Sequence, residues 1–369
     1  MEEVVIVITD LYLTSAAEAA SIRGVELPGL ARIARYGNSH ALEQGWRPWL
    51  ATWSGQGELA QSAPATIAAA ASRATTEEAN GRMMWLATPV HLVAGLSSVH
   101  LDARGLLQVD LDTRRALAQD FNTVFAESDF RLEALPSAGF LVTGPRIEDL
   151  DTVEPARILG ASVTEVLPAA STAPTVRRLV AEIEMWLHSH EVNDRRTRRG
   201  RLPITAFWLW GGGVAREGIA LGVEQQLLGT DTTDTVPASL VRGAALAATG
   251  TPIPGVAFGD DPYLHGLWRM SGSNARTTPA SFEEVLGHPG RRAVFVLELS
   301  RSFDEHHQWT IREALVDLDR RWIVGALDAL RRRDIGRVTV VANDHRLTLG
   351  TRDPWKLWRM PRPALTALQ

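Results

Sequence analysis

A chain of 369 residues, of which 45% are hydrophobic and 22% charged, is long enough for one large domain or two ordinary ones with a sizeable core. Its formal net charge of −5 at pH 7 excludes a protein attracted in bulk to nucleic acid or to an anionic membrane surface. The absence of cysteine excludes disulfides, thiolate catalysis and cysteine-ligated zinc, and is typical of a cytoplasmic protein.

The first segment, MEEVVIVITD, is predicted to contain a buried strand and not a signal peptide. Residues 4–9 form a continuous apolar run rich in β-branched side chains, which suits a strand covered on both faces. Two acids precede the run, which is too short for a signal-peptide core or a membrane span. No later segment reaches spanning length without charges, so we expect no membrane association.

The middle of the chain reads as a compact α/β unit. A helix is predicted over residues 27–37, ending at Gly37, whereas residues 38–80 give no firm pattern. Strands are predicted at 83–93, 130–135 and 139–144, and a hairpin is predicted from 99–102 with 106–111. A helix is predicted at 112–128. A connector over 146–174 and an amphipathic helix over 175–190 follow.

The last third alternates strands with helices. Strands are predicted over 206–210, 293–299 and 337–342, and helices over 239–250 and 311–333. This order predicts an α/β fold with a mostly parallel sheet covered by helices on both faces, and the first strand is assigned to the same sheet. Residues 1–80 and 146–369 would then form the core, and residues 81–145 an inserted smaller α/β domain.

Acidic and histidine residues follow three of the predicted strands. In an open α/β sheet, ligands bind outside the carboxyl ends of the strands, so these side chains are expected at one edge. Because crowded carboxylates repel one another, they require a proton, a cation or a metal, and mixed carboxylate and imidazole ligands suit Mn²⁺ or Zn²⁺. The predicted ligands are Asp10, Asp304, His307, Asp344 and His345.

Each of these residues also has a simpler interpretation. Asp10 and Asp304 are the residue type that ends strands and caps helices, and the pair at 344–345 can be an ordinary strand exit. The adjacent histidines 306 and 307 cannot both face one site in an extended segment. The prediction of a metal or phosphate site therefore depends on all three clusters lying at the same edge.

The stretch PITAFWLWGGG, residues 203–213, runs from a bulky apolar strand into three glycines. Its tryptophans share one strand face, which favours a wall of the core over ligand stacking. The glycines allow a close backbone approach to an anion or to another element, but form no GxGxxG or Walker pattern. The preceding basic run, residues 193–201, reads as a solvated connector or an anion contact, and less readily as a nucleic-acid stripe.

The order of these motifs resembles the archaeal-type cofactor-independent phosphoglycerate mutases. The segment HEVNDRRTRRGRLPITAFWLWGGG is similar to a family stretch with N-x-x-R, a glycine and W-x-W-G-x-G. LELSRSFDEHHQW is similar to an acidic D-E-x-x-H stretch, and VANDHRLTLGTRDP to a D-H-x-T segment near the C-terminus. The block with LLQVDLDTRRALAQDF resembles the family's second domain, so the likeness is patchy but spans most of the chain.

The resemblance implies an alkaline-phosphatase-like core with two divalent metals, Mn or Zn, and a serine that carries a phosphoryl group between two glycerate oxygens. By this resemblance Asp10, Asp344 and His345 would bind one metal, and Asp304 and His307 the other. The substrate would be a small phosphorylated metabolite. Its contacts would come from four residues on the shared segment: Asn193, Arg196, Gly211 and Gly213.

The chain also departs from the family pattern. It has no G-S-D context for the nucleophile, and Ser54, in TWSGQG, is the remaining candidate. The family's D-G after the first strand is Asp10-Leu11 here, and its Y-R-H segment is replaced by residues 138–140, Ala-Gly-Phe. Two hypotheses follow: a metal-dependent phosphoryl-transfer enzyme, or a catalytically degenerate relative that binds a phosphorylated ligand or a protein partner. The missing nucleophile favours the second.

Overall fold

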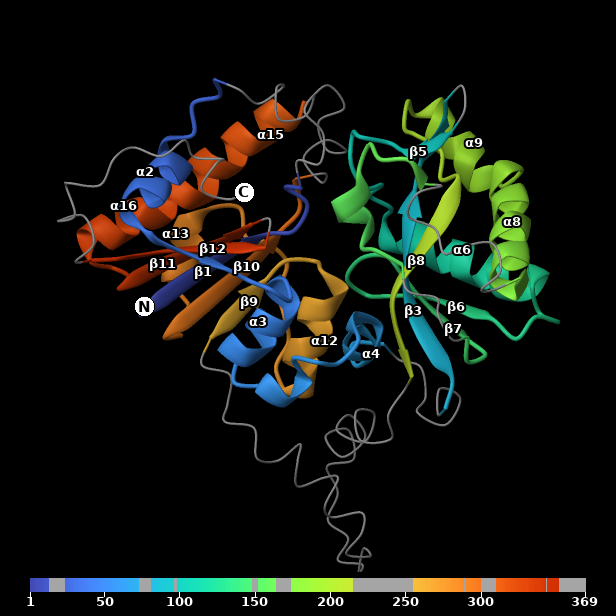
Figure 1. The fold of residues 1–369 in the computed structure, drawn as a ribbon, viewed down its shortest axis with the longest axis horizontal. Helices are drawn as coiled ribbons and strands as arrows, with labels where there is room; N and C mark the ends of the chain where they lie inside the picture. The colour runs from blue at the N-terminus through green and yellow to red at the C-terminus, as the bar shows by residue number, and fades with distance from the viewer. Residues whose placement is uncertain are drawn as a thin grey trace, which may run out of the picture.

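A computed structural model describes most of the chain and divides it into two lobes, each built around its own sheet (Figure 1). The described residues are 1–12, 24–72, 81–95, 98–147, 152–163, 174–214, 255–288, 290–299, 310–342 and 344–351. The predicted helix over 239–250 lies outside these ranges. Within them, every helix is too short or too polar to cross a membrane.

The first lobe contains a six-stranded sheet in the order β2-β12-β11-β1-β10-β9. Four strands run parallel, and the two at one edge, β12 and β2, are antiparallel to their neighbours. The first strand lies in this sheet, as predicted, where it pairs with both β10 and β11. The strands are β1 (Glu3–Ile8), β2 (Asn38–Ala41), β9 (Val256–Phe258), β10 (Arg292–Leu297), β11 (Arg337–Ala342) and β12 (His345–Gly350).

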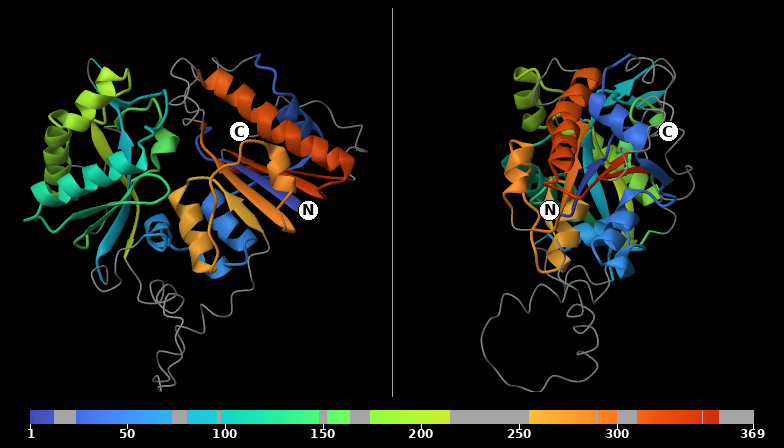
Figure 2. Two further views of the ribbon diagram at one scale, coloured as in Figure 1. Left: turned by 180° about the vertical axis from the view of Figure 1, so that it is seen from behind. Right: turned by 90° about the vertical axis from the view of Figure 1, so that its left-hand side faces the viewer.

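Helices cover both faces of this sheet, which confirms the predicted α/β class (Figures 1 and 2). Alternate residues of β1 point to opposite faces, so Val4 and Ile6 enter one apolar core and Val5 and Val7 the other. The first core is closed by α2 (Pro28–Tyr36), α13 (Phe282–Leu286), α15 (Ile311–Leu318), the π-helical turn η3 (Asp319–Val324) and α16 (Gly325–Arg332). The second is closed by α3 (Trp46–Trp53) and α12 (Pro262–Met270).

The second lobe has an antiparallel sheet in the order β6-β7-β3-β8. Its strands are β3 (Met83–Val90), β6 (Arg131–Ala134), β7 (Phe140–Gly144) and β8 (Ala206–Val214). One face packs against α6 (Leu111–Val124), α8 (Pro174–His188) and α9 (Glu191–Arg198), which confirms the helices predicted over 112–128 and 175–190. The remaining elements are η1 (Gly57–Leu59), α4 (Pro64–Ala69), β4 (Leu92–Ala94), β5 (Val99–Leu101) and η2 (Pro155–Ile158).

The assignment of the tryptophan strand to the central sheet is wrong. Residues 206–214 form β8, which pairs antiparallel with β3 in the second lobe. Phe207 and Leu209 face the core under α6 and α8, while Trp208 and Trp210 face α4 and the connector. A strand buried on both faces looks the same in either sheet, so the apolar run could not identify its neighbours. The second sheet thus draws on residues beyond the predicted 81–145 insert.

The predicted hairpin is also wrong in its pairing. Residues 99–101 form β5, which pairs with β4 and not with residues 106–111. Residues 105–110 are irregular and lead into α6, whose first turn is capped by Asp110 through the backbone N–H of Thr113 at 2.8 Å. The alternating pattern of 106–111 therefore reflects a loop that packs against the lobe and not a strand.

A buried carboxylate ties two helical segments of the first lobe together. Asp319, in η3, is fully buried and accepts the backbone N–H groups of Gly29 and Leu30 at 2.9 and 2.7 Å. These N–H groups belong to the first turn of α2. The N–H groups of a first helical turn have no hydrogen-bond acceptor within their own helix. The contact fixes the start of α2 against the long helical segment 311–332.

We predict that Asp319→Ala lowers the free energy of unfolding by about 2–3 kcal/mol, because two buried N–H groups lose their acceptor. Urea unfolding followed by circular dichroism measures the change. The control is Asp317→Ala, which removes a part-exposed carboxylate paired with Arg321 and is expected to cost under about 0.5 kcal/mol. Equal losses in the two variants would contradict the role assigned to Asp319.

Candidate functional site

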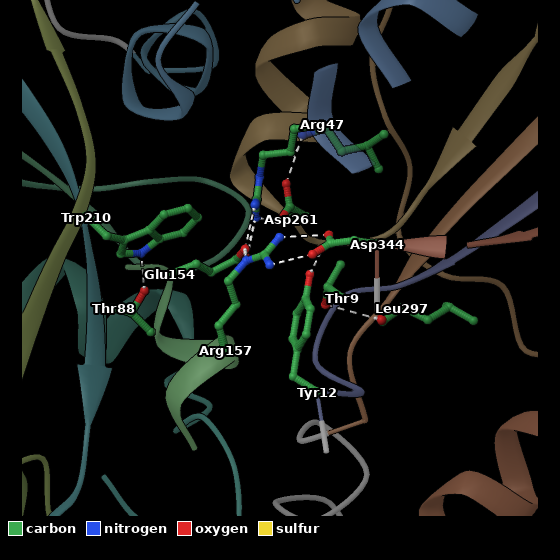
Figure 3. A network of polar contacts seen from close by, with 11 residues as sticks. Thr9, Tyr12, Arg47, Thr88, Glu154, Arg157, Trp210, Asp261, Leu297 and Asp344 are labelled. Carbon is green, nitrogen blue, oxygen red and sulfur yellow. Dashed lines mark hydrogen bonds and ion pairs between the residues drawn. The ribbon is translucent and has the colours of Figure 1, made fainter. Parts of the chain in front are cut away.

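The candidate site lies at the carboxyl edge of the central sheet, where it meets the second lobe (Figure 3). Strands β1, β9, β10 and β11 end there and are followed by acidic residues, namely Asp10, Asp261, Glu298 and Asp344. The start of α3 contributes Arg47, and the connector around η2 contributes Glu154 and Arg157. Side chains from the ends of four strands, from the start of α3 and from the connector therefore meet at the edge where an open parallel sheet binds ligands.

Arg47 is the buried centre of the site. Gly45, at φ +80°, turns the chain into α3, so that Arg47 stands in the first turn of this helix. Its guanidinium forms two hydrogen bonds with Glu154, at 2.7 and 2.9 Å, and contacts Asp261 at 3.4 Å. Burial alone lowers the pKa of Arg47, but these carboxylates outweigh burial and raise it above its ordinary value.

Aromatic rings enclose the same guanidinium. It lies 4.3 Å from the ring centre of Trp46 and 4.7 Å from that of Trp210, which comes from β8 of the second lobe. Trp210 is held in turn by Thr88, whose hydroxyl accepts its indole N–H at 2.9 Å. The cation is thus fixed both by charge and by ring faces from both lobes.

A second arginine engages Asp344. Arg157 donates two hydrogen bonds to the Asp344 carboxylate, at 2.5 and 2.7 Å, and the hydroxyl of Tyr12 contacts the same carboxylate at 3.2 Å. The Arg157 guanidinium also lies 4.5 Å from the centre of the Tyr12 ring. Burial raises the pKa of Tyr12, and so does the nearby Glu154, so the phenol stays protonated and donates.

Carboxylates crowd at the ends of β1 and β10. Asp10 is buried and accepts the backbone N–H of Leu299 at 2.7 Å. Burial, followed by the charges of Asp10 and Asp261, raises the pKa of Glu298 to about 8. Its carboxyl accepts the side-chain amide of Gln108 at 3.1 Å. Glu298 is therefore mostly protonated at neutral pH, which relieves the repulsion at this edge.

A narrow cleft opens between the lobes beside these side chains. It holds about 60 Å³ of space for water-sized molecules, and its walls include Arg47, Glu298 and Trp210. Arg114, on α6, closes the second-lobe side and donates to the carbonyl oxygens of Leu135 and Ser137, both at 2.8 Å. The loop that departs from the family's Y-R-H segment, residues 138–140, lines this cleft and is bound by Arg114.

The structure brings together only part of the predicted metal set. Asp10 and Asp344 both lie at this edge, and His345 begins β12, where it pairs with Ala41 of β2. Asp304 and His307 fall within 300–309, outside the described residues. In the described part of the chain, no three histidine or carboxylate side chains converge to hold an ion. With Asp344 paired to Arg157, the described residues do not fit the implied metal.

Ser54, the predicted nucleophile, lies at the other end of α3. Its hydroxyl is buried and donates to the carbonyl oxygen of Ala51 at 2.9 Å. The neighbouring Trp53 donates its indole N–H to Glu3, the first residue of β1, at 3.0 Å. Because α3 runs from the carboxyl edge of the sheet toward its amino edge, the structure does not bring Ser54 to the site.

The predicted substrate contacts hold the backbone of the second lobe instead. Asn193 bonds the carbonyl oxygens of Leu187 and Ile204 and the N–H of Ile204, all at 2.7 Å. Arg196 donates to the carbonyl oxygens of Leu202 and Gln108. Both side chains are buried, and they fix the turn that leads from α9 into β8.

The glycines that end β8 allow a helix to approach it. A Cβ atom at Gly211 would meet Pro64 at 3.0 Å, and one at Gly213 would meet Ala63 at 2.4 Å. Both contacts belong to the start of α4, so the bare backbone accommodates this helix. This accounts for the glycines of PITAFWLWGGG.

Sequence reasoning missed five of the residues that form the site: Arg47, Glu154, Arg157, Asp261 and Glu298. Two of them carried a usable signal, because Asp261 follows the short apolar run VAF and Glu298 ends the predicted strand 293–299. The two arginines carried none. Arg47 lies in a stretch without a firm pattern, and Arg157 in the connector.

Comparisons with known proteins agree with the resemblance over a short stretch. No protein-family model matches the chain. Over 76 residues it is 38% identical to 2,3-bisphosphoglycerate-independent phosphoglycerate mutase 2 of Methanothermobacter thermautotrophicus, a match covering 20% of this chain. The chain matches about a fifth of that relative's length, 19%.

Two solved structures overlap most of the chain at low similarity. A cofactor-independent phosphoglycerate mutase of Thermoplasma acidophilum covers 95% of this chain and 90% of its own, at 14% identity and a TM-score of 0.38. The PH0037 protein of Pyrococcus horikoshii covers 95% and 89%, at 10% identity and a TM-score of 0.46. Overlaps this loose carry no argument about activity.

Arg47 is more deeply buried than Arg157, so we expect substitutions of these two residues to lower the free energy of unfolding by different amounts. Arg47→Met leaves Glu154 and Asp261 without their shared cation in a buried setting, and we expect a loss of about 3–5 kcal/mol. Arg157→Met removes a pair whose side chains are 33% and 28% exposed, and we expect under about 1 kcal/mol. Urea unfolding of both variants measures the difference, and equal losses would contradict it.

The raised pKa of Glu298 predicts that the free energy of unfolding depends on pH. The folded protein holds this proton up to about pH 8, whereas the unfolded chain releases it near 4.5, so unfolding free energy falls as pH rises between these values. Asp10, Asp261 and Glu154 face the group, and Gln108 donates to it. Glu298→Gln is expected to flatten this slope and to be about 2 kcal/mol more stable than the unaltered protein at pH 8.5. Parallel pH profiles for both proteins would contradict the assignment.

Proposed function

We propose that this chain is a phosphoglycerate mutase-like α/β protein that binds a small phosphorylated metabolite between its lobes without transferring the phosphoryl group. In this proposal the edge that carries the metals and the nucleophile in the resembling enzymes is a binding site built on arginines. The motif order and the 76-residue match support the link to the mutases. They support a shared origin more directly than a shared activity.

The observation that carries the proposal is the engagement of Asp344 by Arg157. A carboxylate that accepts two short hydrogen bonds from one guanidinium has its oxygens directed at that cation. A metal at Asp344 would have to displace Arg157, which is itself held against the ring of Tyr12. The fixed cation therefore takes the electrostatic role that a metal would have at this carboxylate.

The start of α3 supports the same conclusion. Gly45 is followed by Trp46, Arg47 and Pro48, so the first turn of the helix presents an indole and a guanidinium to the edge and supplies no hydroxyl or thiol. Ser54, the remaining candidate, is turned into the core at the opposite end of the helix. A covalent phosphoryl intermediate on these residues therefore has no acceptor.

The arginines also define how a ligand would bind. A phosphoryl group is a stronger bidentate partner for a guanidinium than a single carboxylate is, so it would compete with Glu154 for Arg47 and with Asp344 for Arg157. Because these carboxylates come from different lobes or connectors than the arginines, the exchange would loosen the contact between the lobes. The narrow cleft would widen as the ligand enters.

Metal-dependent phosphoryl transfer is the second candidate. It is favoured by the acidic residues at this edge, where the charges of Asp10 and Asp261 contribute to the raised pKa of Glu298. Residues 300–309, with Asp304 and His307, continue directly from β10. The two candidates differ in whether the purified protein retains a metal.

We expect the protein, loaded with Mn²⁺ and Zn²⁺ and then desalted, to retain no stoichiometric metal by mass spectrometry and to show no phosphoglycerate mutase activity. We expect 3-phosphoglycerate to bind in calorimetry and Arg157→Gln to weaken that binding at least tenfold. The matched control is Arg178→Gln, an 82% exposed arginine paired with Glu182 on α8. One metal per chain that Asp344→Asn removes, together with phosphoryl transfer, would establish the second candidate instead.

A further inference from the structure

A separate polar groove lies on the face of the central sheet that α3 covers. It encloses about 300 Å³, a volume at the lower end of small-molecule pockets. Its floor is formed by outward-facing residues of β1, β11, β12 and β2, and one wall by Trp49 and Trp53 of α3. This groove extends toward the amino ends of the strands and shares no lining residue with the cleft at their carboxyl ends.

The strand register arranges the floor in three rows. Glu3 lies between Arg292 and Arg337 at one end of the groove. Thr339 pairs with Thr348 in the middle. Arg346 pairs with His40 at the other end. The groove therefore has a cationic end, a neutral hydroxyl-bearing middle and a second cationic end.

The one acid of the groove is already satisfied. Glu3 accepts the indole N–H of Trp53 and the hydroxyl of Thr339, both at 3.0 Å, and pairs with Arg292 at 3.3 Å. In the described part of the chain, Arg337 and Arg346 form no ion pair. Among its described lining residues the groove therefore carries three arginines and one glutamate, an excess of two positive charges.

The side chain of Arg346 is positioned to donate a hydrogen bond to a ligand in the groove. It is half-buried, its guanidinium lies 5.8 Å from the ring centre of Trp49, and its shielded Nε has no hydrogen-bond acceptor among the residues that the structure describes. A shielded N–H of a charged group without an acceptor destabilises the protein unless a ligand supplies one. An anion in the groove would remove this cost.

The spacing of the two arginines selects the shape of that anion. Arg346 lies opposite Val341, four residues along β11 from Arg337, which places the two backbone positions about 13 Å apart along the strand. An anion that carries charge at both ends can lie along this line and contact both guanidinium groups. We infer that this groove binds an elongated bisphosphate or short polyphosphate compound, with one anionic end at Arg346 and the other at Arg337.

Tripolyphosphate in magnesium-free buffer at fixed ionic strength is the probe, and isothermal titration calorimetry the measurement. We expect one site per chain, with Arg346→Gln and Arg337→Gln each weakening binding at least tenfold. Inorganic phosphate is expected to bind at least tenfold more weakly than tripolyphosphate. Arg331→Gln, which removes an exposed arginine of α16 from the opposite side of the sheet, is expected to leave binding unchanged.

Arg346→Lys separates charge from hydrogen bonding, because it keeps the cation and removes the planar fork. An affinity between those of the unaltered protein and Arg346→Gln supports the inference, and thermal melting of each variant confirms that it is folded. The inference is overturned if tripolyphosphate does not bind, or if it binds equally to the unaltered protein and both glutamine variants. It is also overturned if Arg157→Gln alone abolishes binding, because the probe then occupies the cleft between the lobes.

Discussion

The ion pair between Arg47 and Glu154 joins the two lobes, and the rest of the site depends on it. Arg47 comes from α3 of the first lobe, Glu154 from the connector that packs on the second, and Asp261 from the start of α12. A guanidinium buried this deeply is stable only while its carboxylates remain in place. Separation of the lobes at this edge would break this ion pair, so an anion that replaced Glu154, as proposed, would also weaken the contact between the lobes.

Part of the first lobe could be predicted from the sequence, namely β1, β10, β11, α2 and the long helical segment 311–332, because their signals are local. The β-branched run at Val4, the alternation of strands with helices in the last third and the stop at Gly37 each act within one element. The neighbour of β8 could not be predicted, because its apolar run suits a buried strand of either sheet. Its bulky apolar residues indicate that both faces are buried, but this does not identify the sheet to which the strand belongs.

The sequence predicted some of the acidic residues at the site and none of its arginines. The rule that ligands gather beyond the carboxyl ends of parallel strands correctly placed Asp10 and Asp344 at one edge. The same rule says nothing of Arg47 and Arg157, which come from a helix start and a connector. The acids at strand ends were interpreted as metal ligands from their charge and position. The structure pairs Asp344 with Arg157, and metal binding by the whole set stays a prediction.

The two arginine-rich regions of the first lobe differ in how their charge is matched. At the carboxyl edge, each guanidinium has a carboxylate within 2.7 Å, so an anion enters only by displacing a protein group. On the sheet face, Arg337 and Arg346 have no such competitor among the described residues, so an anion enters without displacement. A ligand of equal charge should consequently gain more from the groove than from the cleft. An anion bound at the cleft, as proposed, would instead displace Glu154 from Arg47, so its binding would be coupled to the contact between the lobes.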